Sequence, residues 1–290
     1  VYKRQLCLIS ISIMMSNKPR KGIIAWCLFD WANSPYPTVI LTFVFSAYFT
    51  KLVAEDEISG TFLWSQTIAF SGLFMAIVAP ILGEISDETG KKKVWILVFS
   101  ILAILATLSL WFVLPDKKSV PLALIAIAIS LIAFEFCTIF YNATLIQVAN
   151  SSSIGKVSGL GWAAGYIGAI ICLLICLFGL VERNFSFLRH DIDQSEHIRA
   201  TTVVVGLWWF IFSLPFFIFF KEGKGAAHFS RRHILKGLNR LFSTIKNIKQ
   251  PQKPTTPRQP QQTKKKTKKQ NKKQKNKKQK QQKQKKKKIR

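Results

Sequence analysis

The stretch Ala25–Phe49, AWCLFDWANSPYPTVILTFVFSAYF, decides the fold of this chain. It is apolar and longer than the roughly 20 residues that a helix needs to cross a membrane. It nevertheless contains a carboxylate (Asp30), an amide (Asn33) and two prolines (Pro35 and Pro37). A charge placed in hydrocarbon is costly and usually functional, and each proline removes a helix donor. A charged, interrupted first span favours a transporter or a channel over a simple membrane anchor.

Five further segments of spanning length follow the first one. With it, they give six predicted spans, at residues 23–50, 61–83, 94–114, 120–148, 157–181 and 200–220. Because lipid cannot satisfy free backbone groups, helices are the expected structure of each span. The sequence therefore predicts an all-α integral membrane protein with a six-helix transmembrane domain over residues 14–220.

The charge of the chain is concentrated after the last span. Residues 221–290 hold 27 of the 42 Lys and Arg residues and one acid, whereas residues 1–220 are almost neutral. The overall charge of +28 thus describes a tail rather than a fold, and does not by itself indicate nucleic-acid binding. The loops on the two sides of the membrane carry similar numbers of Lys and Arg residues, so the basic tail decides the orientation. Both termini are expected in the cytoplasm, with the chain in the inner membrane of the cell.

The two ends of the chain, before and after the predicted spans, differ from the middle in composition. Residues 1–13 lack an initiator and are expected to be a non-native leader, with a short signal peptide as the weaker alternative. Residues 221–250 predict a basic amphipathic cytoplasmic segment, either on anionic lipid or in an interdomain loop. Residues 251–290, rich in Lys, Gln and Asn, predict a disordered tail. It either binds lipid headgroups or RNA, or results from readthrough into adenine-rich DNA.

The turn after the second span reads GEISDETGKKK and carries a candidate gate. Gly83 would allow close helix approach, and Gly90 would supply a turn conformation that other residues resist. Asp87 would be the latch charge, and the three lysines would anchor the loop in the cytoplasm. The alternative is an ordinary charged turn. The predicted gate residues are Gly83, Asp87, Gly90, Lys91, Lys92 and Lys93.

This turn resembles the signature loop between the second and third spans of the major facilitator superfamily, although Glu88 stands where that pattern usually has a basic residue. A second motif, Phe29-Asp30-Trp31-Ala32-Asn33-Ser34, is similar to the signature of the unknown-major-facilitator branch, which includes the vacuolar amino-acid effluxer linked to autophagy. Blocks at 140–143 and 157–168 agree with the same branch. Pro35 and Pro37 depart from the small residues expected there.

The resemblance implies two six-helix halves, of which this chain supplies the amino-terminal one as an apparent fragment. Transport would then need the missing carboxy-terminal half or a second copy. The resemblance also implies that the first and fourth spans lie side by side along a central cavity. Amino-acid efflux is the substrate class and direction that it suggests.

Two intramembrane carboxylates are the candidate proton carriers. Asp30 lies roughly 14 Å along a helix from Lys21, and Glu135 roughly 21 Å from Pro121, so both fall near the middle of a core about 30 Å thick. The substrate and proton pathway is predicted to consist of Asp30, Asn33, Glu135, Thr138 and Asn142. The alternatives are a structural cap for Asp30 and a satisfied interhelical hydrogen bond for Glu135.

The fifth span carries a small-residue face, Gly161, Gly165 and Gly168, which predicts close helix packing. The five cysteines lie in apolar runs or in the leader and are interpreted as reduced packing residues. No metal-type spacing and no nucleophile–base pair occurs in the spans, so neither a metal, a cofactor nor an enzymatic activity is predicted.

These patterns together predict a secondary transporter that exports a small polar solute by alternating access, with proton coupling. The alternative is a six-span anchor or scaffold that presents its polybasic tail to lipids or nucleic acid.

Overall fold

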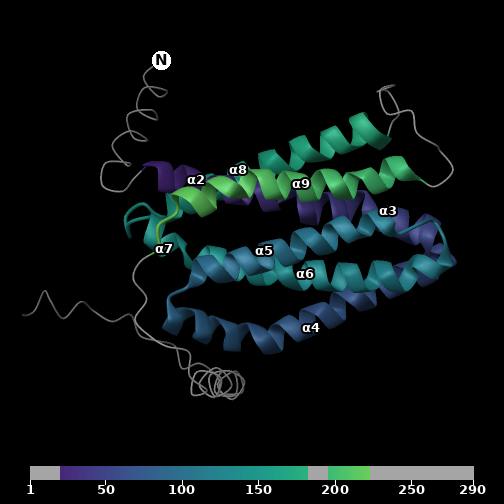
Figure 1. Ribbon diagram of the computed structural model, residues 1–290, viewed down its shortest axis with the longest axis horizontal. Helices are drawn as coiled ribbons and strands as arrows, with labels where there is room; N and C mark the ends of the chain where they lie inside the picture. Colours follow the sequence, from purple (N-terminus) through teal and green to yellow (C-terminus); the bar gives the residue numbers. More distant parts are fainter. Residues whose placement is uncertain (1–19, 182–194, 223–290) are drawn as a thin grey trace, which may run out of the picture. The chain divides into compact units, whose positions relative to one another are not determined.

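The computed structural model describes residues 20–181 and 195–222, and all regular elements in those two ranges are helical. Six helical runs there are long and apolar enough to cross a membrane (Figure 1). They span Lys21–Val53, Glu57–Gly83, Lys92–Phe112, Lys117–Val148, Ile154–Val181 and Glu196–Phe219. This confirms the predicted all-α fold with six spans, each of which begins two to four residues earlier than predicted. The expected leader, nearly all of the basic amphipathic segment and the tail lie outside the described residues.

The first span is continuous but irregular. It consists of α2 (Arg20–Asn33), a π-helical stretch (Tyr36–Phe43), α3 (Phe45–Tyr48) and a second π-helical stretch (Phe49–Val53). Pro35 and Pro37 lack the N–H groups that would close normal helical turns, so the turns widen where the prolines stand. The prolines therefore change the geometry of the span rather than ending it.

Two threonine hydroxyls in the widened part of this span donate to backbone carbonyls. Thr38 Oγ1 donates to the carbonyl of Ser34 at 3.2 Å, and Thr42 Oγ1 donates to that of Pro37 at 2.8 Å.

The second span belongs to α4 (Glu57–Thr89), which extends past the predicted end of that span. Gly83 and Asp87 therefore lie in helix rather than in a loop, which corrects the prediction of a gate loop starting at Gly83. A Cβ at Gly83 would meet no neighbour within 4 Å, so close helix approach there was also wrong for this six-helix unit. Gly90, with a φ of 64°, makes the turn, as predicted.

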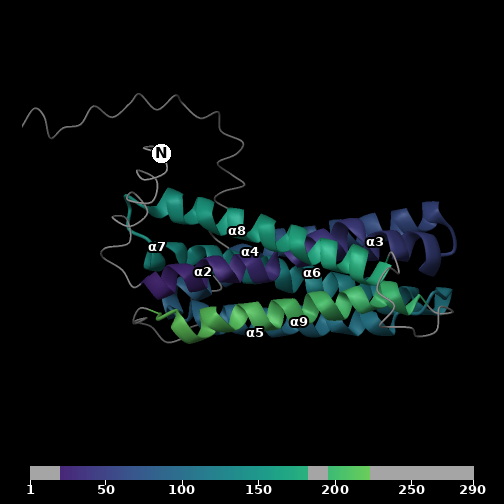
Figure 2. The same ribbon diagram turned by 90° about the horizontal axis from the view of Figure 1, so that it is seen from above.

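The remaining spans are α5 (Lys92–Ser109), α6 (Val120–Ala143) followed by α7 (Leu145–Val148), α8 (Ile154–Cys176) and α9 (Glu196–Phe219). Short 3₁₀ turns extend α5 at Leu110–Phe112 and precede α6 at Lys117–Ser119, and a π-helical turn, Leu177–Val181, extends α8. Helix α2 packs against α8 and α9, while α6 packs against α4 and α5 (Figures 1 and 2). Helix α5 also contacts α9, and this contact joins the two groups.

Successive spans run in opposite directions, so the bundle has two ends. We call them the Lys92 end, where α2 and α5 begin and α9 finishes, and the Lys117 end, where α4 and α9 begin. Between them, large aromatic side chains fill the centre, with Trp26, Phe29, Tyr36, Tyr141 and Trp209 essentially inaccessible to solvent. These rings come from the first, fourth and sixth spans: Trp26 and Phe29 stack on Tyr141, and Tyr36 packs against Trp209.

Candidate functional site

Asp30 lies on the side of α2 that faces α8. A Cβ at Gly165 of α8 would stand 3.3 Å from the Asp30 carboxyl carbon and 2.5 Å from Ser34 Oγ. The Asp30 side chain is half-buried, and among the described residues no hydrogen bond or ion pair reaches its carboxylate. It is close enough to Tyr141 of α6 to interact with it electrostatically. Asp30 therefore lies where the first, fourth and fifth spans meet.

Glu135, on α6, is likewise half-buried and has no hydrogen-bond partner for its carboxylate in the described part of the chain. It lies in electrostatic range of Tyr36 in the first span. One turn along α6, Thr138 Oγ1 is buried without a partner among the described residues. The two polar groups thus lie in neighbouring turns of one helix, as their spacing predicts.

The two predicted amide contacts differ in their surroundings. Asn33 is buried, with 2% of its surface exposed, whereas Asn142 is exposed. Asp30 and Ser34 face Gly165 of α8 rather than α6, so the predicted pathway residues of the first and fourth spans do not all meet within this unit.

Two contacts fix the depth of Asp30 relative to α6. Near the Lys92 end, the rings of Trp26 and Tyr141 stack at 4.5 Å. Towards the Lys117 end, the hydroxyls of Tyr36 and Ser130 are hydrogen-bonded at 2.7 Å. Between these contacts the first span advances ten residues, and α6, which runs in the opposite direction, goes back eleven. Asp30 is therefore level with about position 136 or 137 of α6. At 1.5 Å per residue, Asp30 and Glu135 differ in depth by only about 3 Å.

The three glycines of α8 are the points at which it meets α2. A Cβ at Gly161 would lie 2.5 Å from Trp26 Cζ3, and one at Gly168 would lie 2.8 Å from the Trp31 carbonyl oxygen. With the Gly165 contact, each of the three positions is too close to α2 for a side chain. The absence of side chains on this face therefore lets α8 approach Asp30.

At the Lys92 end, two of the predicted gate lysines bind helix ends of the same unit. Lys93 Nζ donates to the Phe220 carbonyl at 3.0 Å, and the backbone N–H of Lys93 donates to Glu222 Oε1 at 3.0 Å. Lys92 Nζ donates to the Ala143 carbonyl at 3.4 Å. Cations are favourable at helix C-termini and a carboxylate at a helix N-terminus. These two lysines thus join the start of α5 to the ends of α6 and α9.

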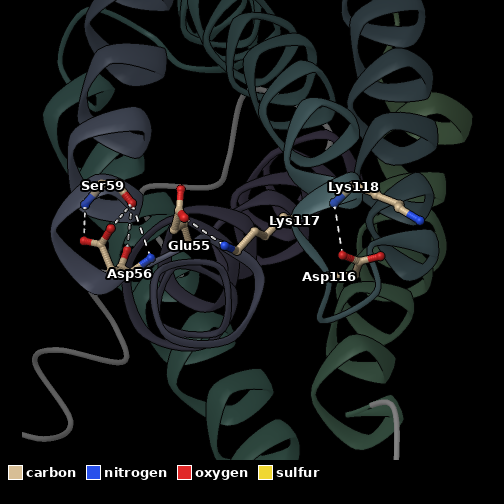
Figure 3. Close-up of polar contacts among 6 residues, drawn as sticks. All are labelled: Glu55, Asp56, Ser59, Asp116, Lys117 and Lys118. Carbon is tan, nitrogen blue, oxygen red and sulfur yellow. Dashed lines mark hydrogen bonds and ion pairs between the residues drawn. The ribbon is translucent and has the colours of Figure 1, made fainter.

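At the Lys117 end, charged groups order the turns between helices (Figure 3). Asp56 precedes α4 and accepts hydrogen bonds from the Ser59 backbone at 2.9 Å, from the Ser59 hydroxyl and from the Ile58 backbone. The backbone and side-chain hydrogen bonds from Ser59 hold the pKa of the Asp56 carboxyl below its usual range. Lys117 Nζ pairs with Glu55 at 2.8 Å, with both side chains exposed.

Arg199, one residue before the predicted start of the sixth span, lies in the first turn of α9 and is buried. Its Nη1 donates to the Trp111 carbonyl at 2.7 Å, its guanidinium lies 5.1 Å from the centre of the Trp111 ring, and Glu196 is 3.7 Å away. It therefore joins α9 to the end of α5.

No cluster of three or more His, Cys, Asp or Glu side chains within residues 20–181 and 195–222 is arranged to hold a metal ion. The four described cysteines are free, and Cys137, Cys172 and Cys176 are buried.

Comparison with known families agrees with this architecture. The family model of the Major Facilitator Superfamily matches residues 6–173, which is more than half of the chain. The chain belongs to the major facilitator superfamily. A second family, described as vacuole effluxer Atg22 like, matches residues 146–255. Both matches agree with the resemblance seen in the sequence motifs.

Similar proteins occur in bacteria and fungi. A Bacillus subtilis (strain 168) protein named uncharacterized MFS-type transporter YxiO is 30% identical over 66% of this chain and 44% of its own length. An uncharacterized protein of Aquifex aeolicus (strain VF5) is 27% identical over 76% of this chain and 52% of its own length. Autophagy-related protein 22-1 of Aspergillus fumigatus is 29% identical over 32% of this chain and 14% of its own length. No solved structure is significantly similar to the chain.

The chain spans about half the length of the two bacterial relatives. As a major facilitator member with six apolar helices, it is a multi-pass membrane protein of a transporter family.

Motif and charge patterns alone did not reveal several polar contacts that support the site. The Tyr36–Ser130 hydrogen bond, the bond from Trp208 Nε1 to the Trp31 carbonyl and the burial of Arg199 join segments far apart in the sequence. One signal was available for the second of these. A proline four residues after Trp31 indicates that the Trp31 carbonyl needs a donor from elsewhere.

Proposed function

We propose that this chain is the amino-terminal half of a secondary active transporter that exports a small polar solute of the amino-acid class, with proton coupling. Asp30 and Glu135 exchange the coupled proton, and Asn33, Thr138 and Asn142 contact the solute. Transport proceeds by alternating access, in which two six-helix halves rock around a site near the midplane.

One observation carries this proposal: two half-buried carboxylates lie at nearly equal depth inside the spans, without a hydrogen-bond partner in the described residues. An ionisable group inside a membrane is expensive and marks an ion or substrate pathway by default. Carboxylates without fixed partners are able to change protonation as water reaches them from one side or the other. The match to the Atg22-like effluxer family supports export as the direction.

The gate residues enter the proposal in a modified form. Gly90 sets the turn between α4 and α5, and Lys92 and Lys93 anchor it to the rest of the unit. Gly83, Asp87 and Lys91 remain candidates for contact with the other half, at the end of the bundle that we place in the cytoplasm of a bacterial-type inner membrane.

A second six-helix unit, supplied by a longer polypeptide or by another copy, completes the proposed transporter. Helix α4 has many exposed apolar residues, and only 6% of its most apolar 18-residue stretch is buried within this unit. The chain also covers about half of its bacterial relatives. Both facts fit a wall of a cavity whose opposite wall lies outside this unit.

Transport of radiolabelled amino acids in proteoliposomes with an imposed pH gradient, by the full chain reconstituted together with the second six-helix unit, tests the proposal. We expect Asp30→Asn and Glu135→Gln to reduce proton-driven transport at least tenfold. The exposed Glu57→Gln is the matched control and is expected to keep it, as is deletion of residues 251–290. Loss of function on removal of the tail, with Asp30→Asn fully active, would instead support the membrane-anchor alternative.

A further inference from the structure

Pro35 and Pro37 leave the carbonyls of Trp31 and Asn33 without their ordinary helical donors, and the first of these carbonyls has a replacement. In an α-helix the carbonyl of Trp31 accepts from the N–H four residues later, but that residue is Pro35, which has none. Trp208 of α9 supplies a replacement, because its Nε1 donates to the Trp31 carbonyl at 3.2 Å. A side chain of the sixth span thus completes the hydrogen bonding of the first.

The same two residues are also held by ring contacts. The indoles of Trp31 and Trp208 are stacked with their centres 5.8 Å apart and an angle of 17° between their planes. The Trp208 ring packs at 4.6 Å against Phe212, one turn further along α9. Helix α8 also comes close to Trp31, since a Cβ at Gly168 would lie 2.8 Å from the Trp31 carbonyl oxygen. The irregular turn is therefore fixed between α8 and α9.

This turn carries the candidate site. Asp30 directly precedes Trp31, and its own carbonyl accepts from the Ser34 N–H at 3.2 Å, just before the π-helical stretch begins. Asn33 lies two residues after Trp31 and is buried. A change in the geometry of the turn at Trp31 would move both polar side chains relative to α6 and α8.

We propose that Trp208 is a positioning residue, whose indole N–H replaces the hydrogen bond that Pro35 removes and so fixes the turn bearing Asp30 and Asn33. The structural part of this inference stands on the Trp208–Trp31 contact alone, whereas its consequence for transport rests on the proposed function. Trp208 does not need to touch the solute or the proton.

The neighbouring Trp209 provides a matched control. It is fully buried against Tyr36 and Phe134, but its Nε1 has no hydrogen-bond partner among the described residues. Trp208→Phe and Trp209→Phe remove the same atoms from adjacent residues of one helix. Only the first of them breaks a hydrogen bond, so a difference between the two variants in the position of the first span reports that bond rather than lost ring volume.

Cys27 is a built-in probe of the first span. It lies one turn before Trp31 and is half-buried, whereas Cys137, Cys172 and Cys176 are buried. In a Cys7→Ser background of the full chain, the rate of Cys27 alkylation by N-ethylmaleimide is expected to rise about fivefold in Trp208→Phe, as for loss of one net hydrogen bond. Trp209→Phe is expected to leave the rate within twofold. Equal rates in the two variants would overturn the proposal.

Restoring the missing donor separates positioning from packing. Pro35→Ala gives position 35 an N–H that can reach the Trp31 carbonyl, so Trp208→Phe made in that background is expected to change Cys27 alkylation by less than twofold. If the fivefold effect persists in the Pro35→Ala background, Trp208 acts by packing and the proposal fails. This comparison needs no transport assay, so it holds whether or not the transport proposal is correct.

The consequence for transport is measured separately. Trp208→Phe is expected to raise the KM for the solute about fivefold and to shift the pH profile of transport, since Asn33 and Asp30 both move. Trp209→Phe is expected to change neither. If the wild-type chain, reconstituted together with the second six-helix unit, does not transport at all, the proposed function fails, while the alkylation results still decide the role of Trp208. An unchanged KM and pH profile in an active Trp208→Phe variant would refute positioning of the site.

Discussion

Replacement of Gly161 by alanine tests the contact that brings α8 against the first span. The new Cβ would lie 2.5 Å from Trp26 Cζ3 and 3.2 and 3.3 Å from the two neighbouring ring carbons. Restoring an ordinary contact of 3.4 Å requires the ring or the helix to move by about 1 Å. A substitution this close to a ring is tolerated only if the ring can yield.

The Trp26 ring has little freedom to yield. Its side chain is 1% exposed, its Nε1 donates to Thr144 Oγ1 at 3.2 Å, and it is stacked on Tyr141 at 4.5 Å. Tyr141 is itself fixed, because its hydroxyl donates to the Trp26 carbonyl at 2.9 Å. Overpacking of this kind destabilises by about 1–3 kcal/mol, and the better helix propensity of alanine offsets at most about 1 kcal/mol.

Gly159 is the matched control on the same helix. A Cβ there would meet nothing within 4 Å, so Gly159→Ala is expected to be neutral or to stabilise by up to about 1 kcal/mol. Reversible unfolding in mixed micelles, followed by circular dichroism, gives the free energy of unfolding of both variants. We expect Gly161→Ala to be less stable than Gly159→Ala by about 1–3 kcal/mol. Equal stability of the two variants would refute the close packing of α8 on Trp26.

Two further predictions concern the Lys117 end. The hydrogen bonds to Asp56 favour its ionised form in the folded chain, so their contribution is present above the unfolded pKa of about 3.9 and is lost as the pH falls through the lower folded value. Asp56→Ala should thus lower the thermal midpoint at pH 7, and its difference from wild type should shrink as the pH falls below about 3.9. Arg199→Met should destabilise by about 1.5–3 kcal/mol, because it removes a buried charged donor from the Trp111 carbonyl. Lys117→Met should change stability by less than about 1 kcal/mol, since its partner Glu55 is exposed; equal effects of the two substitutions in the same unfolding assay would contradict the burial of Arg199.

Span number and the approximate depth of the carboxylates were predictable because both depend on local quantities. Hydropathy over about 20 residues locates a span, and the rise per residue places Asp30 and Glu135 along it. The glycine spacing on the fifth span likewise indicated a face without side chains. Each of these features is encoded within one segment and needs no knowledge of its neighbours.

The neighbouring helix toward which a side chain points was harder to predict, because it depends on how the helices pack against one another. Asp30 shares a face with Ser34, as its spacing requires, but that face meets Gly165 of α8 rather than Glu135. The turn at Gly83 was misplaced for a different reason. The charged residues after Gly83 resemble a loop in composition, yet α4 continues through them to Thr89.

Lys93 and Arg199 show how the unit divides into a fixed and an adjustable part. Lys93, in the first turn of α5, binds the terminal carbonyl of α9, and Arg199, in the first turn of α9, binds a terminal carbonyl of α5. The two antiparallel helices therefore cap each other at both ends of the bundle, where cations complement helix C-termini. The first span has no such reciprocal pair in the described residues: its irregular turn is held by one indole N–H and by close contact with the α8 glycines. Because loss of one neutral hydrogen bond takes less free energy than loss of two hydrogen bonds from charged groups, the turn that carries Asp30 is expected to be released more easily than the α5–α9 pair.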